Sequence, residues 1–168
     1  ELVEAEREPD LQAWMLHGLA VHLALSDGAL DEPHAAAAAD NLWARRDALN
    51  AYTRSLFALA AHHLGQRERA RTLVDNLRNG VAVDDAPDTS VVQRGPGAGD
   101  PAAQRTAHWG QDGVQRRWSN GSVEATAFAL RALVAIDPQN DLVAPTAHWL
   151  FRNRREAQWS NTRDTAIV

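Results

Sequence analysis

Cysteine and lysine are both absent from this chain of 168 residues, so arginine carries all 17 of its Lys/Arg charges. Without cysteine the chain can form no disulfide, no thiolate metal site and no cysteine nucleophile. It also lacks an apolar run of about 18 residues, the length that a membrane-spanning helix needs. Acidic residues outnumber basic ones and the net charge is −5. This charge argues against nucleic-acid binding, because phosphate recognition needs a basic face.

Signals for β-strands are scarce as well. β-branched residues are few, and no run alternates convincingly between apolar and polar residues. Hydrophobic residues nevertheless make up 45% of the sequence, which is enough to bury a core. The length suits one domain, and we predict a single all-α domain over residues 1–168.

Helix signals dominate the chain. Capping residues, prolines in first turns and closing glycines predict about seven helices, namely Asp10–Ser26, Pro33–Arg46, Ala51–Leu64, Arg67–Asn79, Ser122–Ile136, Asp141–Arg154 and one that begins at Thr162. Asp10 is the predicted cap of the first of these helices, and Asn50 that of the third. In the first helix we expect Leu11, Met15 and Leu19 to lie on one stripe, which His22 or Leu23 continues.

The segment 81–117 interrupts this pattern. It contains Pro87, Pro96 and Pro101, several glycines and few apolar residues, and its string RGPGAGDP is incompatible with regular structure. We therefore predict a long irregular loop around 81–117, with room for a short hairpin near Trp109–Trp118.

Short strings recur along the chain. TAHW stands at 106–109 and at 146–149, 40 residues apart (146 − 106), and WSN stands at 118–120 and at 159–161. Leu-x-x-Leu pairs begin at Leu16 and Leu56, also 40 residues apart (56 − 16). The third pair begins at Leu130, 74 residues later (130 − 56), which is about one repeat plus the long loop.

The repeating unit is thus a helical hairpin of about 40 residues, with one apolar helix and one that carries more charge. Units of this size are typical of helical arrays, which form solenoids or closed toroids. We predict an α/α toroid in which apolar inner helices are buried from several sides and amphipathic outer helices face water.

The histidines form no pattern that predicts chemistry. His62 and His63 are adjacent and point to different faces of a helix, and His17 and His22 are five residues apart rather than four. We interpret the histidines as packing or surface residues. The sequence therefore predicts no catalytic, cofactor-binding or metal-binding residue, and no cofactor.

Six tryptophans are many for this length. Packing at the rim of a toroid is the simplest role for them, and an exposed cluster would instead bind sugar or peptide. His108 and His148 each precede a tryptophan, which we expect to be the structural anchor.

Two charged groups have simple explanations. Asp84 and Asp85 follow a helix in the string VAVDDAP and are interpreted as a solvated turn. Terpene cyclases, which are also α/α toroids, use an aspartate-rich acid motif, and only two adjacent aspartates occur here. Arg152, Arg154 and Arg155 complement the C-terminal dipole of the helix that ends near them.

The strings NGSVEATAFALRALVAI, WLFRNR and QWSNTRDTAIV together resemble a known family. They are similar to the later part of the thioester-containing domain of the α2-macroglobulin and complement C3/C4/C5 superfamily, in its bacterial form. Val123–Leu133 resembles the family's VEATAYALLAL, Trp149-Leu150 its next helix, and Trp159–Val168 its W-x-STQDTVVAL string. The likeness extends more weakly back to Asp10.

This resemblance implies a portion of an α/α toroid, because complete family domains have about twelve helices. It also implies a parent protein that traps proteases: cleavage of a bait region changes its shape, and a Cys–Gln thioester acylates the attacker. This chain has no cysteine and so no thioester chemistry of its own. The expected partners are proteases, through the full-length parent, and the rest of that parent chain. The expected location is periplasmic or extracellular, free or anchored to a membrane by lipid.

Two other functions stay open from the residues alone. One is an enzyme of the terpene cyclase or prenyltransferase type, although the zinc site of prenyltransferases includes a cysteine that is absent here. The other is a helical-repeat module that binds peptide or glycan through an exposed aromatic cluster. Because an incomplete ring exposes apolar inner faces, we also expect a homodimer or a bundle whose ends meet.

Overall fold

The structure of this protein is a computed structural model, and it describes residues 8–26, 33–85, 105–111, 121–154, 159 and 162–168. These residues form seven α-helices: α2 (Pro9–Leu25), α3 (Pro33–Ala44), α4 (Ala51–His63), α5 (Arg67–Asp75), α6 (Ser122–Ile136), α7 (Val143–Arg152) and α8 (Thr162–Ile167). Short 3₁₀ turns follow α3 and α5, at Arg46–Ala48 and Asn76–Arg78. One antiparallel pair joins β1 (Ala82–Asp84) to β2 (Thr106–His108).

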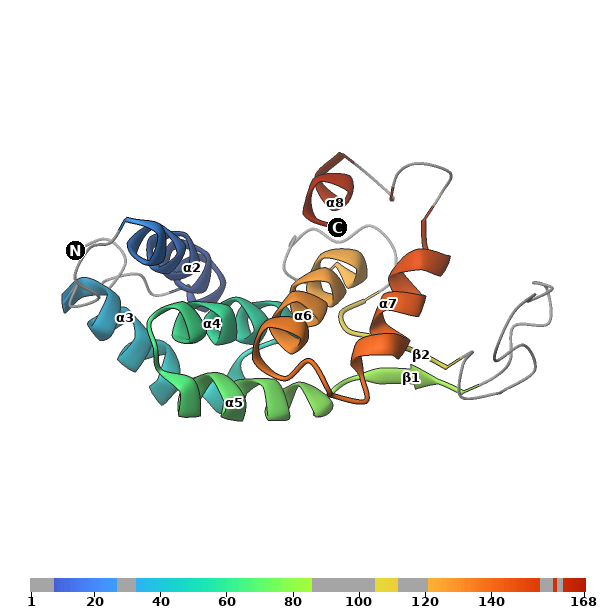
Figure 1. Ribbon diagram of the computed structural model, residues 1–168, viewed down its shortest axis with the longest axis horizontal. Coiled ribbons are helices and arrows are strands. Elements are labelled where there is room, and N and C mark those ends of the chain that lie inside the picture. Colours follow the sequence, from blue (N-terminus) through green and yellow to red (C-terminus); the bar gives the residue numbers. More distant parts are fainter. Residues whose placement is uncertain (1–7, 27–32, 86–104, 112–120, 155–158, 160–161) are drawn as a thin grey trace.

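The helices alternate between an inner and an outer layer. Helix α4 packs along α2 on one side and along α6 on the other, while α3, α5 and α7 each pack against the inner helix that precedes them (Figure 1). Helix α8 continues the inner series by packing against α6. This is the layout of an α/α toroid, and it confirms the all-α fold that the 40-residue repeat predicts.

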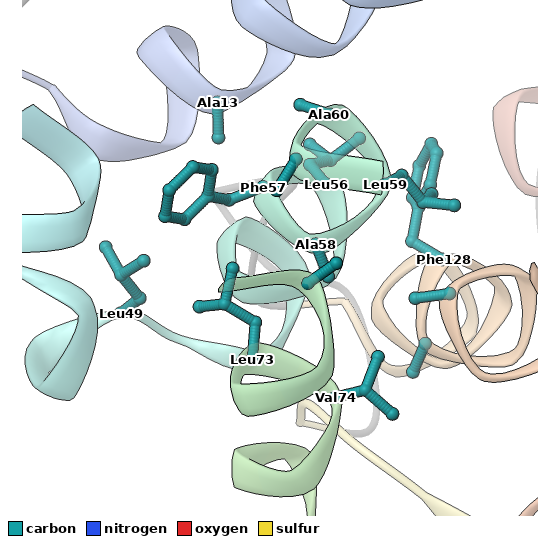
Figure 2. Packing of buried hydrophobic residues seen from close by; sticks show 14 of the residues in the cluster. Ala13, Leu49, Leu56, Phe57, Ala58, Leu59, Ala60, Leu73, Val74 and Phe128 are labelled. Atoms are coloured by element: carbon teal, nitrogen blue, oxygen red, sulfur yellow. The ribbon is translucent and has the colours of Figure 1, made fainter. Parts of the chain in front are cut away.

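Helix α4 lies at the centre of the hydrophobic core. Every residue from Tyr52 to Ala61 is buried, because α2, α5 and α6 cover it from different sides. Figure 2 shows Phe57 on the side of Ala13 and Leu59 beside Phe128, so large side chains fill the gaps that the alanines leave. Burying a side chain of this size stabilises the fold by about 1.5–3 kcal/mol. The middle of the sequence AYTRSLFALAAHH, from Tyr52 to Ala61, is therefore enclosed on all sides, whereas His62 is exposed.

The buried stripe of α2 differs from the predicted one. Leu11 is 41% exposed, whereas Ala13, Leu16 and Ala20 are fully buried. The prediction was wrong because α2 is apolar around most of its circumference, so the 3.6-residue period does not identify one face. Small side chains at Ala13 and Ala20 permit a close approach to α4, and this close packing decides which face is buried.

The N-terminus of α2 also differs from the prediction. The helix begins at Pro9, and Glu8 rather than Asp10 is its N-cap residue. The carboxylate of Asp10 instead accepts hydrogen bonds from the Asn50 amide, at 3.0 Å, and from the Thr53 hydroxyl. Asn50 is the N-cap of α4, as predicted, and its side chain accepts a bond of 2.8 Å from the backbone N–H of Thr53. One polar network thus aligns the first turns of two inner helices.

The segment 81–117 is not wholly irregular. Ala82 pairs with His108, Val83 with Ala107 and Asp84 with Thr106, although the paired segments are 22 residues apart in sequence (106 − 84). Three-residue strands separated by so many residues carry no readable period-2 signal, and their pairing depends on packing against α6 and α7. The hairpin predicted near Trp109–Trp118 lies largely outside the described residues.

Helix α2 contains one exposed glycine. Gly18 lies within the helix, and a Cβ atom built on it meets no heavy atom of the described chain within 4 Å. We expect Gly18→Ala to raise the free energy of unfolding by about 0.5–1 kcal/mol, because alanine loses less backbone entropy than glycine in a helix. Urea unfolding followed by circular dichroism measures this change.

Gly80 provides the matched control. Its φ of +90° is a conformation that L side chains rarely adopt, so Gly80→Ala is expected to lower stability by about 1 kcal/mol. A loss of stability in Gly18→Ala equal to that in Gly80→Ala would show that Gly18 is constrained by more than the helix.

Among the described residues, no helix combines the length and the apolar character that crossing a bilayer requires.

Candidate functional site

The two TAHW strings lie against each other. The His108 ring, in β2, stacks on the Trp149 ring of α7 with a centroid distance of 4.6 Å and an interplanar angle of 11°. Nδ1 of His148 lies 3.4 Å from the backbone oxygen of Arg105. The same four letters thus form a strand in one copy and a helix in the other, and the contact between them fixes β2 to α7.

Trp109 anchors the segment that follows β2. It is only 1% exposed, and its indole Nε1 donates a hydrogen bond of 2.7 Å to the backbone oxygen of Leu77. Its backbone N–H donates to the Thr126 hydroxyl of α6 at 3.0 Å. These bonds tie Trp109 to the 3₁₀ turn that follows α5 and to the first turns of α6. The expectation that tryptophan rather than histidine is the anchor in TAHW is confirmed here.

Three histidines gather at the inner layer, although their sequence spacing does not indicate it. His62 and His63, at the end of α4, have ring centroids 5.8 Å apart, and His17 of α2 lies 6.1 Å from His63. The guanidinium of Arg131, from α6, lies 5.2 Å from the centroid of Phe128, whose ring is 6.4 Å from that of His17. We call His17, His62, His63 and Arg131 the His17 cluster.

Burial and neighbouring positive charges lower the pKa of two histidines in this cluster, His17 and His63. The pKa of His17 falls from 6.5 to about 4, first because the ring is buried and then because Arg131 and His63 repel a proton on it. The pKa of His63 is also lowered, by burial and by His62 and Arg131. His17 is therefore neutral at pH 7. The sequence did not indicate this arrangement, because His17 and His63 are 46 residues apart (63 − 17) and belong to different helices.

No metal centre is apparent in the described part of the chain. Within it, no group of three or more histidine, aspartate or glutamate side chains is arranged to hold a metal ion. Arg131 places a fixed positive charge beside His17 and His63, which disfavours a cation there.

The adjacent aspartates take part in surface structure. Asp84 ends β1, and the carboxylate of Asp85 pairs with Nε of Arg105 at 3.0 Å just before β2 begins. Both are exposed, as predicted, but Asp84 belongs to a paired strand rather than to a turn, because the strand pairing with β2 extends to Thr106. In the arginine group, Arg152 ends α7 and the guanidinium of Arg154 lies 6.0 Å from the Trp159 ring, whereas Arg155 is outside the described residues.

A cavity of about 390 Å³ opens beside the first turn of α4, and Tyr52, Arg54 and Gly110 are among its lining residues. Arg54 is 7% exposed and donates hydrogen bonds to the backbone oxygens of Asn76, at 3.1 Å, and Arg46, at 3.4 Å. Burial lowers its pKa, and Asp47 partly offsets this effect. Arg54 links α4 to the two 3₁₀ turns, a structural role that sequence reasoning missed.

The comparisons with known proteins identify one family. The family model described as "A-macroglobulin TED domain" matches residues 5–168. None of the curated proteins matches the chain. The matched range includes the strings VEATAFALRAL and WSNTRDTAIV, which carried the resemblance in the sequence.

Proposed function

The chain belongs to the A-macroglobulin TED domain family, and from this premise we propose that it is a non-catalytic structural part of a bacterial α2-macroglobulin-like protease inhibitor. The family is that of the thioester-containing domain of α2-macroglobulin and complement proteins. The observation that carries the proposal is the match over residues 5–168 of a chain that contains no cysteine. A thioester requires a cysteine sulfur, so these 168 residues can form none.

The packing of the inner helices supports a structural role. The large side chains of α4 are used in contacts with α2, α5 and α6, and its buried arginine bonds to backbone oxygens. The aspartate pair that would favour a cyclase lies at the surface. No observation favours the enzyme alternative or the helical-repeat module that binds peptide or glycan.

The proposed partners follow from the proposed role. Proteases would meet this chain through the full-length protein, in the periplasm or outside the cell, and the rest of that protein would contact its outer and inner helices. The isolated chain would pair with a second copy through apolar side chains that remain exposed, which include Leu11 (41%), Trp14 (45%) and Val134 (51%). Light scattering should then give twice the mass of the 18.4 kDa chain, and a mass of one chain at high concentration would contradict this pairing.

A protease assay on the full-length protein tests the proposed trap. An enclosed protease loses access to large substrates by steric exclusion, whereas a small peptide still diffuses in. We therefore expect preincubation to abolish cleavage of a folded protein substrate and to leave most of the activity toward a short chromogenic peptide. Endopeptidases of several specificities should be compared, since the target protease is not specified by this chain.

The matched control is the same protease with its active site covalently blocked before mixing. A trap that is triggered by cleavage should change its mobility on a native gel with the active protease and not with the blocked one. Equal loss of activity toward both substrates would indicate an inhibitor that occupies the active site. No loss toward either substrate, with every protease tried, would contradict the proposal.

A further inference from the structure

A short connector joins the outer layer to the strand pair. Asn79 and Gly80 follow the 3₁₀ turn Asn76–Arg78 and precede β1, which begins at Ala82, so they belong to no helix or strand (Figure 1). Both residues are exposed to solvent, and both line the cavity of about 390 Å³ beside the first turn of α4. The dipeptide Asn-Gly occurs twice in the sequence, here and at 120–121, and residue 120 lies outside the described residues.

The side-chain amide of Asn79 is not held by the fold. It forms no hydrogen bond with any residue that the structure describes. Other asparagine amides are held: those of Asn50 and Asn140 donate to carboxylates at 3.0 Å and 2.8 Å, and that of Asn153 donates to a backbone oxygen at 2.9 Å. The side chain of Asn79 can therefore rotate about its Cα–Cβ bond without losing a contact of this kind.

The backbone nitrogen of Gly80 is equally unconstrained. The N–H of Asn79 donates to the backbone oxygen of Asn76 at 3.1 Å, whereas the N–H of Gly80 donates to no residue in the described part of the chain. Gly80 has a φ of +90°, and a Cβ atom built on it meets no heavy atom within 4 Å. Neither a side chain of its own nor a hydrogen bond therefore shields the Gly80 nitrogen from the amide that precedes it.

We propose that Asn79 is a site of spontaneous covalent modification, at which the folded chain converts asparagine to isoaspartate and aspartate. The Gly80 nitrogen attacks Cγ of Asn79, and its proton passes to hydroxide or water. A five-membered succinimide forms as the bond from Cγ to the amide nitrogen breaks, and this nitrogen leaves as ammonia. Water then opens the ring, at the backbone carbonyl carbon to give isoaspartate or at Cγ to give aspartate. Nothing is oxidised or reduced.

The fold permits this reaction because it leaves both reacting atoms free to approach. The reaction is intramolecular, so its rate depends on how often Cγ and the next backbone nitrogen meet in the right orientation. Inside a helix or a strand pair, hydrogen bonds fix the peptide plane and prevent this approach. A Cβ atom on the following residue obstructs it as well. The connector at Asn79 and Gly80 imposes neither restriction.

The modification changes the charge and the backbone at this place. Each event converts a neutral amide to a carboxylate, so the net charge of the chain goes from −5 to −6. The new charge lies at the cavity that Arg54 also lines, and no salt bridge between described residues involves Arg54. Isoaspartate also lengthens the main chain by one methylene group between α5 and β1. This inference goes beyond the proposed protease trap and does not depend on it.

Peptide mapping by mass spectrometry of the whole folded chain, incubated at pH 8 in water enriched in ¹⁸O, tests the site. Each carboxyl group that forms takes up the heavy isotope, and an isoaspartate-specific methyltransferase then labels the isoaspartate product. We expect residue 79 to react roughly tenfold faster or more than Asn50, Asn140 and Asn153, whose amides are held. Ion-exchange chromatography should show a growing fraction of chains with one more negative charge.

Variants separate reaction in the folded chain from reaction after unfolding. Asn79→Gln should slow modification at residue 79 roughly tenfold or more, because the longer side chain places its carbonyl carbon less favourably for ring closure. Gly80→Ala should slow it too, although this variant is expected to be less stable, so tighter folding cannot explain the slowing. Asn120→Gln removes the other Asn-Gly pair and should leave the rate at residue 79 unchanged.

A peptide spanning residues 76–83 provides the rate of the unstructured sequence. Conversion of residue 79 in the folded chain at a rate within about tenfold of the peptide supports the proposal. An unmodified residue 79 after the peptide has been converted would overturn it. So would a faster reaction in Gly80→Ala than in wild type, which would place the chemistry in the unfolded chain. The protease assay does not use these signals, so the two proposals can fail separately.

Discussion

Replacing Trp109 with alanine is expected to lower the free energy of unfolding by about 3–5 kcal/mol, the largest effect that we predict for one side chain. The indole is 1% exposed and belongs to the core cluster that includes α4 and α6. Removing it leaves a cavity and also strips the backbone oxygen of Leu77 of its hydrogen bond. Because a small domain has only about 5–15 kcal/mol of stability, this change would remove a large part of it. Urea unfolding measures it.

One further variant separates the hydrogen bond of Trp109 from its packing, and a second variant is a control at an exposed side chain. Trp109→Phe keeps much of the packing and loses the Nε1 donor, so it should cost about 1–3 kcal/mol. Phe151→Ala removes a side chain that is 72% exposed and should stay within about 0.5 kcal/mol of wild type. A Trp109→Ala protein as stable as Phe151→Ala would contradict the anchoring role of Trp109.

The second large effect that we expect is a loss of stability at acidic pH. His17 has a pKa of 6.5 in the unfolded chain and of about 4 in the folded one, so the unfolded chain binds more protons between these values. Stability is therefore complete above pH 6.5 and is lost progressively as the pH falls toward 4. Because the neighbouring Arg131 and His63 are also basic, no described group offsets this loss. The full difference corresponds to about 3 kcal/mol.

The pH dependence should be measured as urea unfolding at intervals from pH 7.5 to pH 4, for wild type and His17→Gln. The variant has no titrating ring, so the part of the slope due to His17 should disappear even if the variant is less stable throughout. His62→Gln changes the exposed histidine of the cluster, which does not act on the pKa of His17, so it is the matched control and should keep most of the slope. Parallel curves for wild type and His17→Gln would show that burial does not depress the basicity of His17.

The regular part of the fold could be predicted because local and repeated signals agreed. Helix α6 runs from Ser122 to Ile136 as expected, and α4 begins at Ala51 after the predicted Asn50 cap. The 40-residue repeat predicted which helices are inner, because the Leu-x-x-Leu pairs that begin at Leu16, Leu56 and Leu130 mark them. These helices could be predicted because capping residues, composition and repeat length all indicated the same elements.

The rest depends on contacts between distant segments. The pairing of β1 with β2 and the approach of His17 to His63 are both tertiary, and neither leaves a periodic trace in the sequence. The buried face of α2 was predicted wrongly for a related reason. In an apolar helix with small residues on two sides, packing against the neighbouring helix decides which face is buried. Arg54 could have been noticed as the only basic residue inside the apolar string AYTRSLFALAA.

Native-state hydrogen exchange of the whole chain tests the central claim most directly, which is that α4 is the enclosed inner helix around which the hairpins pack. Amides of α4 from residue 55 to residue 61 should exchange only through global unfolding, and so should be the slowest in the molecule. Amides of the outer helices α3 and α7 should exchange roughly tenfold faster or more, through local opening. Exchange in α4 as fast as in α3 would contradict the inner and outer layers described for this chain.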